Sequence, residues 1–126
     1  MGVVTVFLIS CKKKTTQTTT TTQTTTTTQQ LPATVSFSTN VVPIFNSSCN
    51  SSGCHAATSP AAGLNLTPAS AYSSLMAKQE TYTVNPSGSH LYIVITNGSM
   101  PKGAASLSSY NQQLILKWIQ QGALNN

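Results

Sequence analysis

Residues 49–55 of this 126-residue chain read "CNSSGCH". Four residues separate Cys49 from Cys54, and His55 follows directly. The whole chain has only three cysteines and two histidines, so two thiols and an imidazole this close together are a marked concentration of reactive groups. This stretch therefore decides what the surrounding domain has to bind or bridge.

Three chemistries suit these residues. Two cysteine thiols can bond covalently to the vinyl groups of haem while the next histidine ligates the iron, although the common C-x-x-C-H motif is shorter. A Cys49–Cys54 disulfide is sterically possible in an exported protein. A structural zinc ion could take Cys49, Cys54, His55 and His90, but adjacent ligands such as Cys54 and His55 fit one tetrahedron poorly.

A second signal for haem lies downstream, where residues 98–103 read "GSMPKG". Met76 belongs to an apolar helical stripe and has an ordinary packing role. Met100 instead lies in a loop of Gly, Ser and Pro that has no periodic face to bury it. A thioether in a proline-stiffened loop suits the sixth position of a haem iron. His90 is the alternative sixth ligand, although a surface histidine beside Ser89 is the simpler interpretation.

Composition limits the folded part to one small domain. Residues 15–30 contain only Thr and Gln, which predicts a solvated spacer because such a run cannot bury apolar surface. Residues 34–126 remain for the domain. Domains of this size often depend on a cofactor or a covalent staple.

Charge excludes several classes of function. The formal net charge of +5 comes from six lysines against Glu80, with no Asp and no Arg. Half of the lysines lie near the N-terminus, so the domain has no basic stripe, and we do not expect a nucleic-acid partner. One carboxylate cannot form an acid/base pair, and no Asp is present to orient a catalytic histidine. A bound cofactor that brings its own chemistry fits this composition better. The lysines are Lys12, Lys13, Lys14, Lys78, Lys102 and Lys117.

The N-terminus reads "MGVVTVFLISC" and has the features of an export signal. Its apolar run is far shorter than the roughly 20 residues that span a bilayer. Residues 8–11 resemble the bacterial lipobox, which implies that residues 1–10 are a lipoprotein signal peptide and that Cys11 carries the lipid. Residues 11–33 would then be a lipid-anchored, disordered linker on the cell envelope, facing the periplasm or the exterior. The lipid would also account for the odd cysteine, since Cys49 and Cys54 remain as a pair.

Helical patterns recur through residues 34–126. In the last pattern, Ser108 is the expected N-cap and Gly122 the expected end, with an apolar face between them formed by Leu114, Ile115, Trp118 and Ile119.

Three shorter helices are expected before it. The first covers about 40–49, with Ser38 or Thr39 as its N-cap, and the second starts from Thr67. The third follows Ser89, and its β-branched residues leave it ambiguous between strand and helix, of which we favour helix. A small all-α domain is expected, with one internal cavity that a bound group would occupy.

An ordered set of short motifs resembles the class I monohaem cytochrome c domain of exported bacterial lipoproteins. The set is "PIF" at 43–45, the Cys-His motif, "GLNL" at 63–66, "SHLY" at 89–92, Met100-Pro101 and "WIQQGA" at 118–123. The resemblance implies a cytochrome c-like fold of three to four short helices around one covalent haem c, with the first helix packed across the last. It implies thioethers at Cys49 and Cys54, iron ligation by His55 and Met100, and a pocket of Phe45, Leu64, Leu66, Leu91, Tyr92 and Trp118.

The function that the resemblance implies is one-electron transfer, not enzymatic catalysis. The chain would be a membrane-tethered monomer that cycles between Fe(II) and Fe(III) with redox protein partners. One alternative is a haem-based sensor in which Met100 dissociates to admit a small ligand. The other is a structural lipoprotein without haem, stapled by a Cys49–Cys54 disulfide.

Overall fold

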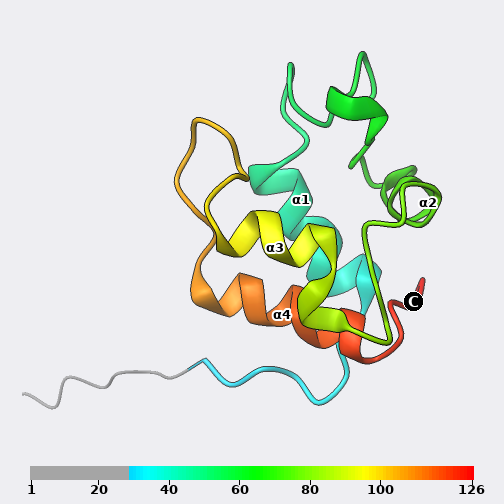
Figure 1. Cartoon of the computed structure of the whole chain (residues 1–126), viewed down its shortest axis with the longest axis vertical. Coiled ribbons are helices and arrows are strands. Elements are labelled where there is room, and N and C mark those ends of the chain that lie inside the picture. The colour runs from blue at the N-terminus through cyan, green and yellow to red at the C-terminus, as the bar shows by residue number, and fades with distance from the viewer. Residues whose placement is uncertain (1–28) are drawn as a thin grey trace, which may run out of the picture.

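The computed structural model describes residues 29–126 and shows a small all-α domain in that range, with no strand (Figure 1). Its four α-helices are α1 (Val42–Ser48), α2 (Ala71–Ala77), α3 (His90–Thr96) and α4 (Ser109–Gln120). A π-helical turn, Phe37–Val41, leads into α1, and two 3-10 turns occupy Ala61–Gly63 and Pro86–Gly88. This confirms the predicted all-α class.

The predicted signal peptide, Cys11 and most of the Thr/Gln linker lie outside the described residues. Between residues 29 and 126, every helix is too short or too polar to cross a bilayer.

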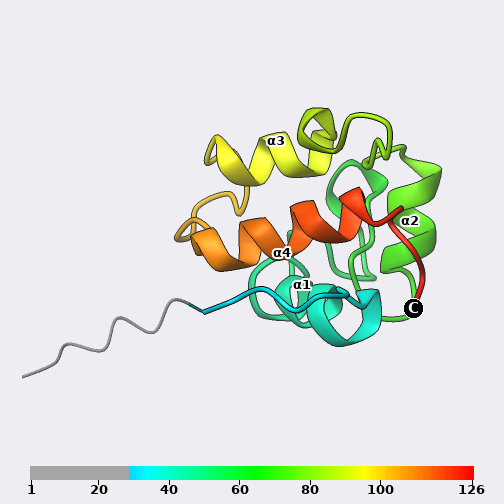
Figure 2. The ribbon, with the colours of Figure 1, turned by 90° about the horizontal axis from the view of Figure 1, so that it is seen from below.

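Helix α4 is the main support of the domain and follows the prediction closely. The Ser108 hydroxyl accepts a hydrogen bond from the Asn111 amide, and Gly122, with φ of +99°, follows the helix end. The predicted apolar face of α4 is buried. Figure 2 shows α3 along one side of α4 and the α1 segment along the other.

The first helical segment starts earlier than predicted. The N-cap is Ser36, whose hydroxyl accepts from the Thr39 amide, so neither Ser38 nor Thr39 caps this segment. The reason is tertiary: the Phe37 ring lies 4.9 Å from the Trp118 ring and 6.3 Å from the Phe45 ring, between centroids. Because Phe37 is buried in this aromatic cluster, the helical segment extends back from α1 to Phe37.

The segment before Phe37 is joined to the C-terminal end of the domain. The Gln121 side chain accepts from the Val35 amide at 2.9 Å and donates to the Ala33 carbonyl at 2.7 Å. The Asn126 side chain accepts from the Phe37 amide at 2.8 Å. These three bonds, which we call the terminal clasp, tie residues 33–37 to Gln121 at the end of α4 and to Asn126 beyond it.

One predicted helix start differs from the structure, and the serine before another helix makes no side-chain capping bond. Helix α2 begins at Ala71 with Ser70 as its N-cap residue, after a turn in which the Ser70 amide donates to the Thr67 carbonyl at 3.0 Å. The Thr67 hydroxyl donates to the Asn65 side chain at 2.7 Å. The segment after Ser89 is helical, as favoured. However, the Ser89 hydroxyl accepts from the Tyr82 amide at 2.7 Å and makes no capping bond.

Candidate functional site

A cavity of about 330 Å³ lies among the loop that follows α1, helix α3 and the loop that follows α3. Its volume falls within the roughly 300–1,000 Å³ of small-molecule sites. Cys49, Cys54 and His55 line it from the first loop, and Met100 lines it from the last. Most of the remaining wall is apolar, including Leu64, Leu66, Leu91, Val94 and Ile95.

His55 is held in one orientation by its surroundings. It is 9 % exposed, and its Nδ1 lies 2.9 Å from the Leu64 carbonyl oxygen. Since a carbonyl only accepts, Nδ1 donates, and the lone pair of the neutral ring is on Nε2. The main chain of His55 is fixed as well, by bonds of 3.1 Å to the Cys49 carbonyl and 2.8 Å from the Leu66 amide. A buried imidazole with Nδ1 engaged is the usual arrangement of a metal ligand.

Cys49 and Cys54 are free thiols, so the structure does not contain the disulfide that was one alternative. Cys49 is buried at the end of α1, and Cys54 is half-buried. Burial raises the pKa of Cys49 to about 11, and the nearby Cys54 adds to the rise. Cys49 is therefore a neutral thiol near neutral pH.

The extra residues of the Cys-His motif are exposed, and one of them, Gly53, also lines the cavity. Ser51, Ser52 and Gly53 are exposed, and the Cys54 amide donates to the Ser51 carbonyl at 3.0 Å, which closes a turn. Gly53 has φ of +79°, a left-handed conformation that favours glycine. The longer spacing thus forms an outward turn, and both thiols still line the cavity.

Met100 is positioned by the end of α3. Its amide donates to the Val94 carbonyl at 2.9 Å, and its half-buried side chain packs against the apolar core. Gly98, with φ of +81°, lets the chain turn back after α3. Met100 therefore reaches the same cavity as His55.

The predicted pocket residues divide into two groups. Leu64, Leu66 and Leu91 line the cavity. Phe45, Tyr92 and Trp118 do not: Phe45 and Trp118 are fully buried in the aromatic core, and Tyr92 packs on the core from α3 with its hydroxyl 3.4 Å from the Gln113 amide nitrogen. These three residues support the structure behind the cavity.

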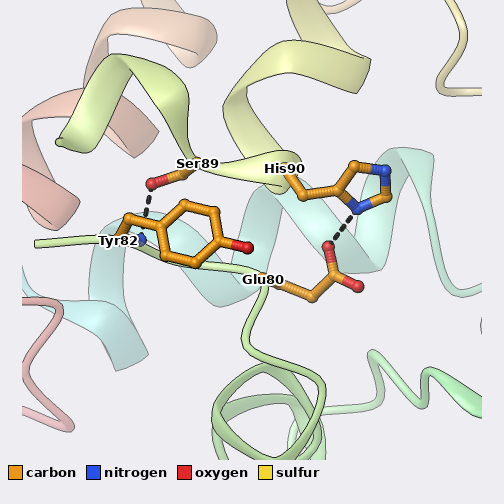
Figure 3. A network of polar contacts seen from close by, with 4 residues as sticks. All are labelled: Glu80, Tyr82, Ser89 and His90. Carbon is orange, nitrogen blue, oxygen red and sulfur yellow. Dashed lines mark hydrogen bonds and ion pairs between the residues drawn. The ribbon is translucent and has the colours of Figure 1, made fainter.

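A pair of ionisable residues at the cavity was missed by the sequence analysis. The carboxylate of Glu80 lies 2.6 Å from Nδ1 of His90, and both residues line the cavity (Figure 3). The Glu80 side chain is 15 % exposed and that of His90 is 62 % exposed. The clue in the sequence was that Glu80 is its only acidic residue. The sequence predicted His90 as a surface histidine or, alternatively, as an iron or zinc ligand, and no partner for it was expected.

Zinc has no support in this part of the chain. Residues 29–126 contain no group of three or more His, Cys, Asp or Glu side chains placed to hold a metal ion. His90 is instead paired with Glu80.

The donor set does fit haem: two free thiols, an imidazole with Nε2 available, a thioether and an apolar wall all line one cavity. Comparisons with protein-family models, curated proteins and solved structures find no match to this chain. The chemistry of the site is therefore argued from its own residues.

Proposed function

We propose that the chain is a monohaem c-type cytochrome that carries single electrons. The observation that carries the proposal is the meeting of Cys49, Cys54, His55 and Met100 at one apolar cavity, although Met100 is far from the others in sequence. A cavity lined by these four donor types suits a covalently attached haem better than a disulfide or a zinc ion.

Each residue has a distinct role in this proposal. Cys49 and Cys54 would hold the haem c through thioethers, and His55 Nε2 and the Met100 sulfur would ligate its iron. When bound, the haem supplies the Fe(II)/Fe(III) couple. The Leu64 carbonyl keeps the His55 ring oriented. A mainly apolar wall and a thioether ligand would favour a raised reduction potential.

The proposed fold class is cytochrome c-like. Support comes from the packing of Phe37, at the start of the first helical segment, against Trp118 of the last helix. The Cys-His motif directly follows that first segment. The same helical segment therefore positions both the aromatic cluster and the Cys-His side of the cavity.

An electron carrier fits the residues better than an enzyme does. With two protein ligands on the iron, no coordination site is left for a substrate. Residues 34–126 carry a net charge of +2 from three lysines and one glutamate, which the haem carboxylates would offset. We therefore expect redox protein partners found with little electrostatic steering. The proposal includes tethering to the bacterial envelope through Cys11.

The test is a spectrum of the purified protein from a host with active cytochrome maturation. A pyridine haemochrome of the c type is expected, and the oxidised protein should show a weak near-red band from Met–iron ligation that Met100→Ala removes. Carbon monoxide should bind the wild type poorly, and tight binding would favour the sensor alternative. A colourless protein would contradict the proposal.

A further inference from the structure

Apart from the two thiols and His55, the cavity has three ionisable side chains: Glu80, His90 and Lys102. A haem brings two carboxylates into a cavity whose wall is mainly apolar. Carboxylates at an apolar site need donors, because an unpaired charge loses hydration at a large cost. The arrangement of Glu80 and His90 is the more specific of the two candidate donor sites.

The Glu80–His90 pair is built into the main chain. The Glu80 amide donates to the Leu75 carbonyl at 3.0 Å, and the Glu80 carbonyl accepts from the Leu91 amide at 3.0 Å. Directly before α3, the buried Ser89 hydroxyl accepts a hydrogen bond from the Tyr82 amide at 2.7 Å (Figure 3). These bonds fasten residues 80–82 against the start of α3, which fixes the relative positions of the two side chains.

The pair leaves one ring nitrogen of His90 unused. Nδ1 contacts Glu80, and Nε2 points away from that carboxylate (Figure 3). When the imidazole is protonated both nitrogens donate, so a His90 imidazolium that donates to Glu80 has a second N–H for another acceptor. The neighbouring titratable or charged side chains are Lys78 and Tyr82 beside Glu80, Tyr92 on α3, and Lys102 in the loop after Met100. Glu80 is the only acid among them.

We propose that His90, oriented by Glu80, binds one propionate carboxylate of the haem through Nε2–H. This inference rests on the proposed haem function and assigns a recognition role to a pair that ligates no iron. The hydrogen bond would be charge-assisted, with an imidazolium between two carboxylates. Because the His90 side chain is partly exposed, solvent limits the strength of this hydrogen bond.

The test varies the protein and the ligand together. The full-length, haem-free protein is titrated with ferric protoporphyrin IX and, separately, with its dimethyl ester, which has no free carboxylate. Binding is followed by quenching of Trp118, the only tryptophan of the chain. The wild type should prefer the free acid. His90→Gln should reduce that preference by roughly three- to ten-fold and leave ester affinity unchanged.

Lys117→Gln, which removes a cation on α4 that does not line the cavity, is the matched control and should keep the full preference. An equal preference in His90→Gln and wild type, with both porphyrins bound, would overturn the inference alone. Failure of the wild type to bind either porphyrin would instead count against the proposed function. If His90→Gln loses ester binding through misfolding, His90→Asn is judged by the same ratio.

Discussion

The two sides of this small domain are built differently. On one side, α4, the Phe37 turn and the terminal clasp form a continuous core in which Trp118 and Ile119 are fully buried. On the other side, loops around residues 50–63 and 97–106 surround the cavity, with most side chains exposed and few helical turns. The first side is stabilised by its own packing. The second is positioned by turns and main-chain bonds, as expected of a region that is completed by a ligand.

Trp118→Ala should have the largest effect on stability, because it removes the central side chain of the core around α4. Trp118 is 0 % exposed, and its indole N–H donates to the Leu124 carbonyl at 2.8 Å. We expect a loss of about 3–5 kcal/mol in the free energy of unfolding, measured by urea denaturation. A loss below about 1 kcal/mol would show that the two sides do not differ as described.

The two thiols should differ in reactivity in the haem-free protein. The pKa of Cys49 is raised to about 11 from 9.0, so its thiolate fraction near pH 8 is about a hundred-fold below that of an unshifted thiol. Iodoacetamide should therefore modify the half-buried Cys54 first, and Cys49 should react faster as the pH rises toward 11. Mass spectrometry of timed samples gives both rates. Equal rates at pH 8 would mean that Cys49 is not buried as shown.

Gln121→Ala should have a smaller effect, on the terminal clasp. The variant loses two hydrogen bonds, to Val35 and Ala33, while the aromatic cluster remains. We expect about 1–2 kcal/mol of destabilisation, with faster amide hydrogen exchange at residues 33–37. Gln120→Ala, at an exposed position, is the control and should change little.

Gly53→Ala, in the loop around residues 50–63 beside the cavity, should have the smallest effect on stability. No atom lies within 4 Å of a Cβ built at Gly53, so the cost is only that of its φ of +79°. About 1 kcal/mol is expected, and the yield of covalent haem should be nearly unchanged. A complete loss of attachment would show that the outward turn is itself part of the site.

The same division explains which features could be predicted from sequence. Helix α4 was predictable because its cap and apolar stripe are local signals. The start of the first segment at Phe37 was not, because it depends on packing against Trp118, distant in sequence. Leu64 and Leu91 were placed in the cavity by resemblance. Phe45 was misplaced because a large apolar residue has the same pattern whether it faces a ligand or the core.

The Glu80–His90 pair was not predictable for a further reason. The two residues lie ten positions apart, and no helical or strand spacing relates them. They meet because the Leu91 amide and the Ser89 hydroxyl bind the main chain of residues 80 and 82. Such a pairing becomes visible only when the loop path is known.

The intact mass of the denatured protein tests the central claim most directly. After expression with cytochrome maturation and extraction of any loosely held haem, we predict a mass increase of one haem, located by peptide mapping to residues 49–55. Cys49→Ser with Cys54→Ser is the matched control and should lack it. An unmodified mass in the wild type, with both cysteines free to alkylate, would contradict the account.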